Sequence, residues 1–245
     1  MISINTNYGG LYAAKAAQSS QHLMDKAMER LSTGKRINYA QDDAAGQALA
    51  TRLTAEIQGL AMASRNAADG QAMLNTAEGA LQETHNLLLR MRELAVQAGN
   101  GTMTTDDQAA LDKEFQALDD EVNRIATKTT WAGTNLLDQT GGATGKFAFQ
   151  VGVKASETIE VTIGDMKSAT LSIDSLDVTD ATKSNAAITA LDAAIKTVST
   201  ERANLGAFSN RLESTITNVN QIGVNLAASK GRIEDADFAK ETGNL

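Results

Sequence analysis

Residues 53–98 read LTAEIQGLAMASRNAADGQAMLNTAEGALQETHNLLLRMRELAVQA. Steps of seven from Leu53 to Ala95 meet only apolar residues, and the same holds from Leu191 to Ile233. A sustained seven-residue apolar repeat keeps one side of a helix facing a partner helix, as in a coiled coil. We therefore expect two long helices that pack along their lengths. The predicted seam residues are Leu53, Leu60, Ala67, Leu74, Leu81, Leu88, Ala95, Leu191, Val198, Leu205, Leu212, Val219, Leu226 and Ile233.

The second apolar position of each repeat is less regular than the first. In the C-terminal stretch it is filled by Ile195 and Ile216, but also by Arg202 and Ser209. A strict two-chain zipper needs an apolar residue at most such positions. The pattern therefore favours two helices of one chain packed against each other.

The overall composition supports long helices and excludes several functions. Proline, which breaks helix interiors, is absent. Cysteine is also absent, which excludes disulfides, thiolate chemistry and cysteine-ligated zinc. The net charge of −8 argues against nucleic acid as a partner, because that binding needs a basic surface. No run of 18 apolar residues occurs, so we expect no membrane insertion, and the N-terminus lacks the features of a cleaved signal.

Two further helices are expected beside the long pair. Apolar residues in a 4-3-4-3 spacing predict a helix from Leu111 to Ile125, and Thr105 with Gln108 forms a candidate capping box before it. Residues 13–31 form a weaker seam of mostly small side chains. Because such a face buries little apolar surface, we expect this segment to be disordered in a free monomer and helical only against partners.

The segment between the helical halves has a different pattern. FAFQVGV (147–153) and TIEVTIG (158–164) alternate apolar and polar residues, which predicts a β-hairpin, and TLSIDSLDV (170–178) is a candidate third strand. The expected fold is mainly α, a long antiparallel coiled-coil-like helical rod with a small β-hairpin element between its helices. The expected parts are a core segment and connector (1–45), rod helices (46–138), a β-hairpin and short variable region (139–185), and a C-terminal rod helix with the start of a connector (186–245).

Motifs for catalysis, metals or cofactors are not found. The sequence has no phosphate-binding GxxxxGK[ST], no HExxH and no GxSxG, so we expect neither an enzyme nor a bound cofactor or metal. Asp42 and Asp43 are adjacent carboxylates, but Ala44, Ala45 and Gly46 follow where a calcium loop needs oxygen ligands. We interpret the pair as the start of a helix, whose N-terminus favours acidic residues.

The stretch LLLRMRELAVQ (87–97) carries Arg90, Glu93 and Gln97 close together on one helix face. Such a face is either a solvated surface with charge pairs or a binding epitope. The residues alone leave both interpretations open.

Several long stretches resemble bacterial flagellin. In the N-terminal half these are RLSTGKRINYAQDDAAGQALATR (30–52), SRNAADGQAMLNTAEGALQE (64–83) and LRMRELAVQAGNGT (89–102), and in the C-terminal half LGAFSNRLESTITNV (205–219) and SKGRIEDADFAKET (229–242). The resemblance implies a structural subunit that self-assembles into the extracellular flagellar filament and leaves the cell unfolded through the flagellar type III apparatus. The implied partners are other flagellin subunits, a flagellar export chaperone, and hook-associated and cap proteins.

The resemblance also implies a recognition site. Flagellins are recognised by the flagellin-sensing Toll-like receptor of animals through a surface that also lies at subunit contacts. The matching residues here are Arg90, Leu94, Gln97 and Glu114, with Leu89 at a position where many family members carry Gln. The alternatives are a flagellin-like surface or secreted ligand-binding protein and a hook–filament junction protein. Because the sequence ends at ETGNL, where family members usually continue into another helix, we expect a chain that is shortened or that ends early.

Overall fold

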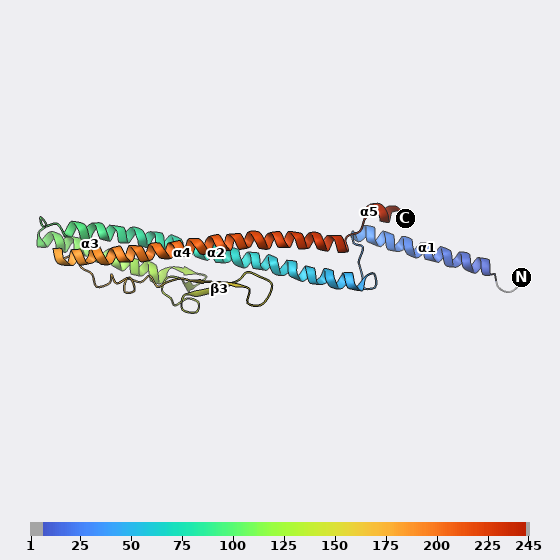
Figure 1. Cartoon of the computed structure of the whole chain (residues 1–245), viewed down its shortest axis with the longest axis horizontal. Helices are drawn as coiled ribbons and strands as arrows, with labels where there is room; N and C mark the ends of the chain where they lie inside the picture. The colour runs from blue at the N-terminus through green and yellow to red at the C-terminus, as the bar shows by residue number, and fades with distance from the viewer. Residues whose placement is uncertain (1–6, 244–245) are drawn as a thin grey trace. The chain divides into compact units, whose positions relative to one another are not determined.

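The computed structural model describes residues 7–243 and is mainly helical (Figure 1). The fold class predicted from sequence is confirmed, since two long helices are accompanied by small two-stranded sheets. The elements are α1 (Tyr8–Thr33), α2 (Ala44–Ala98), α3 (Thr105–Lys128), β1 (Thr130–Trp131), β2 (Thr134–Asn135), β3 (Lys146–Gln150), β4 (Thr158–Thr162), α4 (Ala181–Glu234) and α5 (Phe238–Gly243). Residues 244 and 245, at the chain end for which we expected shortening, lie outside the described residues.

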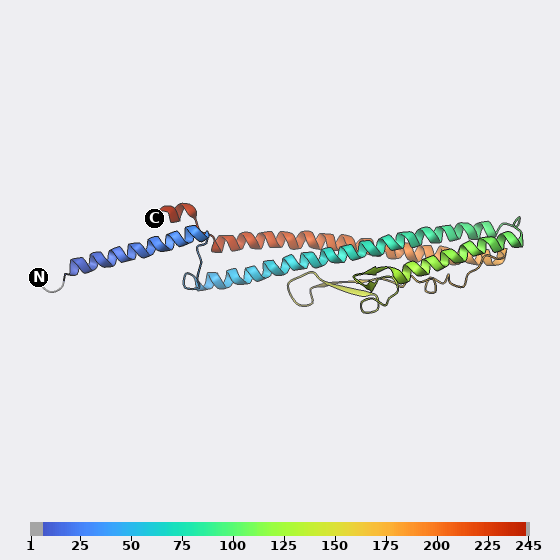
Figure 2. The same cartoon turned by 180° about the vertical axis from the view of Figure 1, so that it is seen from behind.

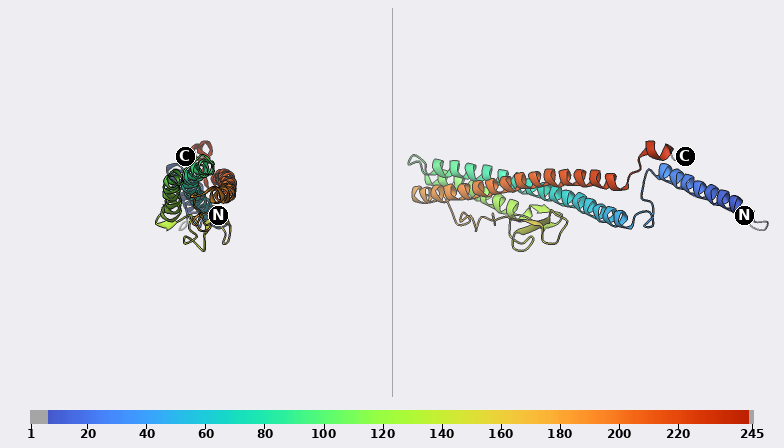
Figure 3. Two further views of the ribbon diagram at one scale, coloured as in Figure 1. Left: turned by 90° about the vertical axis from the view of Figure 1, so that its left-hand side faces the viewer. Right: turned by 45° about the vertical axis from the view of Figure 1, so that its right-hand side comes forward.

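The chain forms two compact units. The larger one covers residues 62–219, and the smaller one combines the described residues up to 61 with those from 220 onward. In the larger unit α2, α3 and α4 lie side by side, and the strands lie on one side of them (Figures 1 and 3). Cross-helix contacts join Arg92 to Asp192, Glu78 to Arg202, and Gln71 to Ser209. Residue numbers fall along α2 as those of the partners rise along α4, so the two helices run antiparallel.

The core of the larger unit contains most of the seven-residue repeat. Leu74, Leu81, Leu88, Leu191 and Leu212 are at most 1% exposed. Ala67, Ala95, Val198, Leu205 and Val219 are buried as well. Each leucine buried from water contributes about 1.5–3 kcal/mol to folding, so this seam is a main source of stability for the unit.

The start of α3 differs from the expected cap by one residue. Thr104 is the N-cap residue: its Oγ1 accepts a hydrogen bond from the backbone N–H of Asp107, and Asp107 accepts one from the N–H of Thr104. Gln108, which we expected to belong to the box, is buried and donates from Nε2 to the carbonyl oxygen of Ala98 at 2.8 Å. Gln108 thus satisfies a free carbonyl at the C-terminal end of α2, and the shorter Asp107 serves the cap.

The predicted hairpin is confirmed. β3 and β4 pair antiparallel, with Phe149 opposite Ile159. The hairpin packs on α2 where a glycine leaves room, since a Cβ on Gly70 would lie 3.1 Å from the Phe149 ring. Asn66 of α2 also donates a hydrogen bond to the carbonyl of Gln150. The β1–β2 pair was not expected from sequence, because its turn residues Ala132 and Gly133 lack the Asn-Gly or Asp-Gly signal.

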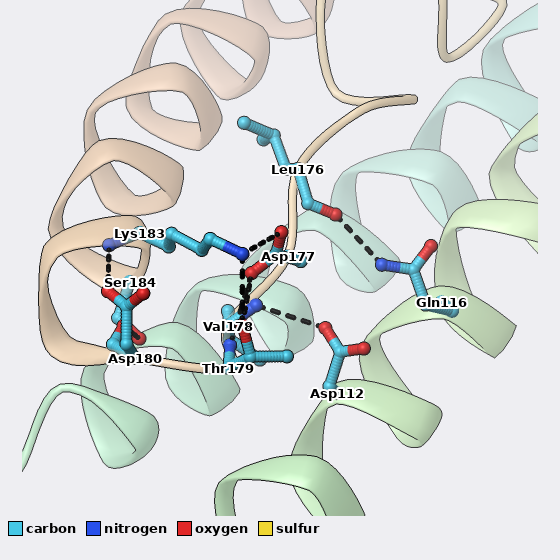
Figure 4. Close-up of polar contacts among 9 residues, drawn as sticks. All are labelled: Asp112, Gln116, Leu176, Asp177, Val178, Thr179, Asp180, Lys183 and Ser184. Carbon is cyan, nitrogen blue, oxygen red and sulfur yellow. Dashed lines mark hydrogen bonds and ion pairs between the residues drawn. The ribbon is translucent and has the colours of Figure 1, made fainter.

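The predicted third strand at 170–178 is wrong. This segment forms turns, with Leu171, Ile173 and Val178 buried and Ser172 at a positive φ of 58°. Its backbone hydrogen bonds go to nearby residues and to side chains of α3 rather than to a neighbouring strand (Figure 4). The alternate apolar residues of this segment are buried against helices. A short alternating pattern in the sequence does not distinguish such a buried loop from a strand.

In the smaller unit, α1 is a helix from Tyr8 to Thr33, whereas we expected this segment to be disordered in a free chain, and α5 packs beside it (Figure 2). Arg30 of α1 binds Glu241 of α5, with Nη1 2.9 Å from Oε1. Ala27 is the buried residue of α1, while Tyr8, Leu11 and Tyr12 are more than 60% exposed. Of the seam residues in this unit, Leu60 is buried, and Leu53, Leu226 and Ile233 are half-buried.

Candidate functional site

The surface around Arg90 is built by two helices. Arg90 projects from α2, and its Nε and Nη2 donate hydrogen bonds to Oε1 of Glu114 on α3 at 3.0 and 2.8 Å. Its Nη1 donates to Glu93, three residues further along α2, at 3.1 Å. Glu114 first, and then Glu93, raise the pKa of the Arg90 guanidinium above its usual value. Arg90 is therefore a fixed, fully charged group on an accessible face.

The four residues predicted for the recognition site do not share one environment. Arg90, Gln97 and Glu114 are exposed, and the ion pair joins two of them. Leu94 is fully buried in the core, so in the free chain it cannot belong to an exposed contact surface. We name the three exposed residues the Arg90 surface.

Two exposed apolar residues lie next to the Arg90 surface. Leu89 is 42% and Val96 is 51% exposed, and their spacing of seven places them on one side of α2. Sequence reasoning singled out Leu89 by comparison with the family but did not single out Val96. The seven-residue spacing of two large apolar residues outside the main seam was the signal available for it.

The neighbouring residue Arg92 forms an ion pair with a different helix. Its Nε lies 2.6 Å from Oδ1 of Asp192 on α4. The Asp192 carboxylate raises the pKa of Arg92. Arg92 therefore ties α2 to α4, and Arg90 ties α2 to α3.

The adjacent residues Asp42 and Asp43 of the smaller unit make different contacts. Asp43 caps α2, because its Oδ1 accepts a hydrogen bond from the N–H of Gly46 at 2.9 Å. Asp42 does not cap the helix: its Oδ2 accepts from the N–H groups of Asn38 and Tyr39, and its Oδ1 lies 2.7 Å from Nζ of Lys26. The hydrogen bond from Lys26 is the main reason that the pKa of Asp42 falls to about 2.

The segment that follows α1 and the segment that follows α4 meet in the smaller unit. The N–H of Arg36 donates to the carbonyl of Glu234 at 2.7 Å, and the N–H of Ala236 donates to that of Gly34 at 3.0 Å. Lys35 and Lys230 both form ion pairs with Glu234. This clasp joins the connector after α1 to the connector after α4.

None of the described residues forms a group suited to hold a metal ion. In the part of the chain between residues 7 and 243, no three His, Cys, Asp or Glu side chains are arranged for coordination. Over the same residues, no helix is long and apolar enough to cross a membrane. The accessible polar residues described above form ion pairs and helix caps.

Comparison with known proteins gives the class and then the family. Residues 4–141 match the model of the bacterial flagellin N-terminal helical region, and residues 188–245 match that of the C-terminal helical region. These two helical regions define a structural, non-enzymatic protein. The chain belongs to the bacterial flagellins, and it is a structural subunit of the extracellular flagellar filament.

Individual relatives are similar over nearly the whole chain. A flagellin of Halalkalibacterium halodurans is 44% identical over 97% of this chain and 87% of its own length. A flagellin of Bacillus subtilis is 42% identical over 98% of this chain and 89% of its own length.

Solved structures show the same fold. The crystal structure of Bacillus cereus flagellin is 36% identical, covers 68% of this chain and 94% of its own, and has a TM-score of 0.58. A putative flagellar hook-associated protein from Vibrio parahaemolyticus has a TM-score of 0.65 over 79% of this chain and 100% of its own. At 16% identity, the second likeness concerns the fold alone.

Proposed function

We propose that the Arg90 surface has two uses in this flagellin. In the filament it contacts neighbouring subunits, and in the free chain it is recognised by the flagellin-sensing Toll-like receptor of animals. The observation that carries the proposal is the exposed Arg90 guanidinium, which two carboxylates from two helices hold in one orientation. An arginine fixed in this way gives a partner a preorganised donor, and arginine is enriched among residues that dominate binding energy.

Leu94 supports this surface from below. It is buried in the core, so we assign it a positioning role: its packing sets where α2 presents Arg90 and Gln97. A substitution of Leu94 acts on recognition through the fold, whereas a substitution of Arg90 acts through a direct contact.

The test compares two arginines that are both exposed and both paired with glutamate. Arg90→Ala removes the pair with Glu114, and Arg124→Ala removes an exposed pair with Glu121 within α3. We expect Arg90→Ala to reduce signalling in receptor-bearing reporter cells at least tenfold, because loss of a well-placed contact costs 1.4 kcal/mol or more, about a factor of 10. Arg124→Ala should signal as the wild type does. Equal signalling by both variants would show that the site is elsewhere.

We further propose that α1 contributes to contacts between subunits. Its exposed apolar side chains support this: Tyr8, Leu11 and Tyr12 lie within two helical turns and leave a larger apolar area in water than an isolated residue would. α1 also buries little of its surface within its own chain, with Ala27 as its buried residue.

A single introduced charge tests the role of α1. Leu11→Asp places a carboxylate in the apolar group, and Ser19→Asp places one at another exposed position of the same helix. We expect Leu11→Asp to lower the amount of protein that sediments as filament after salting out with filament seeds, because a carboxylate is costly to bury in a contact. Ser19→Asp should sediment like the wild type. The same yield for both variants would argue against α1 as a contact.

Family membership also supports proposals for transport and capping. We propose that the chain is exported unfolded by the flagellar type III apparatus, with a flagellar export chaperone, hook-associated proteins and a cap protein as partners. The smaller unit exposes Phe238 next to the clasp, which is a candidate contact for a chaperone. Replacing Phe238 with Ser should weaken chaperone binding in a pull-down assay, and unchanged binding would remove this residue from the interface.

A further inference from the structure

Three polar residues form a stripe along the side of α3. Asp112, Gln116 and Asp119 are spaced four and three residues apart, which places them on one face of the helix. Figure 4 shows the first two of them directed toward the chain segment that leads into α4. Residues 165–178, which we call the α3 loop, cross this face and bury Leu171, Ile173 and Val178 in the core.

The first two residues of the stripe satisfy the backbone of the α3 loop. Oδ1 of Asp112 accepts a hydrogen bond from the N–H of Val178 at 3.0 Å, and Nε2 of Gln116 donates to the carbonyl of Leu176 at 2.8 Å (Figure 4). The two segments run in opposite directions, because the later residue of α3 contacts the earlier residue of the loop. In this register the loop residue nearest to Asp119 is expected to be Asp174.

The third position differs because both residues are carboxylates. Asp119 is 9% exposed, and its Oδ1 is buried without a hydrogen-bond partner. Burial is the main cause that raises the pKa of Asp119 to about 6, followed by the negative charges of Asp120 on α3 and Asp174 on the loop. All the charged groups of the described chain that shift this pKa are therefore negative.

We propose that Asp119 is a proton-dependent latch that controls how firmly the α3 loop is docked on α3. When Asp119 takes up a proton, the buried anion and its repulsion with Asp174 are both removed, and the loop docks firmly. When Asp119 loses the proton, the loop is held by the contacts of Asp112 and Gln116 and by its apolar side chains, and it opens more often.

The direction of the pH effect follows from linkage. The folded-state pKa of about 6 lies above the ordinary value of 3.8, so the folded chain binds this proton more tightly than the unfolded chain does. Protonation of Asp119 therefore stabilises the docked α3 loop increasingly as the pH falls through 6. This stabilisation reaches its full size below pH 3.8. It is absent well above pH 6.

The experiment follows the carboxyl group and the loop together. In the whole chain labelled with carbon-13, the Asp119 carboxyl resonance should titrate near pH 6. Hydrogen-exchange protection of the Ile173 and Val178 amides, corrected for intrinsic exchange rates, should be higher at pH 5 than at pH 8. The upper limit between these two pH values is about tenfold, because pH 5 lies one unit below the pKa of about 6 and each unit is a factor of 10 in the equilibrium.

Matched variants separate the latch from a general effect of charge. Asp119→Asn should make loop protection high at both pH values. Asp120→Asn, the same change at an exposed neighbour, removes one of the charges that raise the pKa of Asp119, so it should move the pH dependence to lower pH but not abolish it. Asp174→Asn should move the titration of Asp119 to lower pH without restoring the ordinary value, since burial remains. The proposal is overturned by an Asp119 resonance that titrates near 3.8, or by protection in Asp119→Asn that changes with pH as in the wild type.

Discussion

Arg202 of α4 donates a hydrogen bond of 2.9 Å from its Nε to Oε1 of Glu78 on α2. Its Nη2 donates a second one to the side-chain oxygen of Gln82, one turn further along α2. Arg202 occupies a seam position at which the repeat calls for an apolar residue. The cross-helix contacts explain how the helices remain packed there, because Arg202 is paired with Oε1 of Glu78 and with Gln82, although Oε2 of Glu78 is buried without a hydrogen-bond partner.

Removing Arg202 should weaken the seam. Arg202→Ala leaves Glu78 and Gln82 without their partner, and we expect a loss of about 1 kcal/mol of unfolding free energy, small because both charges keep partial contact with water. Urea denaturation measures this loss of unfolding free energy. Arg92→Ala, which breaks the more exposed pair of α2 with α4, is the control and should have a smaller effect. Equal losses of unfolding free energy in the two variants would show that the seam position of Arg202 adds nothing to its contribution to stability.

Leu212 tests the apolar part of the same seam. Its side chain is fully buried, and Leu212→Ala should cost about 2–5 kcal/mol, the range for buried Leu→Ala changes that leave a cavity. The matched change Leu89→Ala removes the same atoms from a side chain that is 42% exposed and should lower stability far less. Thermal unfolding followed by circular dichroism compares the two, and similar melting temperatures would contradict the assignment of Leu212 to the core.

The cap of α3 can be tested residue by residue. Thr104→Ala removes the hydroxyl that accepts from Asp107, and the expected loss is about 1 kcal/mol. Thr105→Ala lies one position inside the helix and should be neutral, since alanine favours helix. Denaturation of both variants distinguishes the two possible caps, and a larger loss for Thr105→Ala would restore the cap expected from sequence.

Asp42 gives the smaller unit a pH dependence of opposite sign to that of Asp119. Lys26 and two backbone N–H groups lower the folded-state pKa of Asp42 to about 2, below the ordinary 3.8. Its contribution is therefore complete above pH 3.8 and is lost as the pH falls through 2. Wild type should melt at a higher temperature than Asp42→Asn at neutral pH, and this difference should shrink toward pH 2. A difference that does not change with pH would exclude the ion pair as its source.

The long helices were predictable because their signal is repeated many times. Seven apolar positions from Leu53 and seven from Leu191, each spaced by seven residues, give a stronger signal than irregular positions such as Arg202. The hairpin of residues 146–162 was predictable for the same reason, since both of its strands alternate cleanly. The charged face around Arg90 could be located, although its contact with Glu114 depends on how α3 packs.

Other features depend on contacts that the sequence does not encode locally. The α3 loop has the alternation of a strand, but Asp112 and Gln116 satisfy its backbone, so no strand forms. Leu94 was placed on the surface by resemblance, while the packing of α2 in the larger unit buries it. The choice between Thr104 and Thr105 as cap depended on Gln108 binding the end of α2.

The most direct test of the account is to locate the protein on the cell. Family membership makes this chain a structural subunit of the flagellar filament, so gold-labelled antibody raised against the purified chain should decorate filaments along their length in electron micrographs. Label spread over the cell envelope, with bare filaments, would contradict the account and favour a ligand-binding protein on the flagellin scaffold.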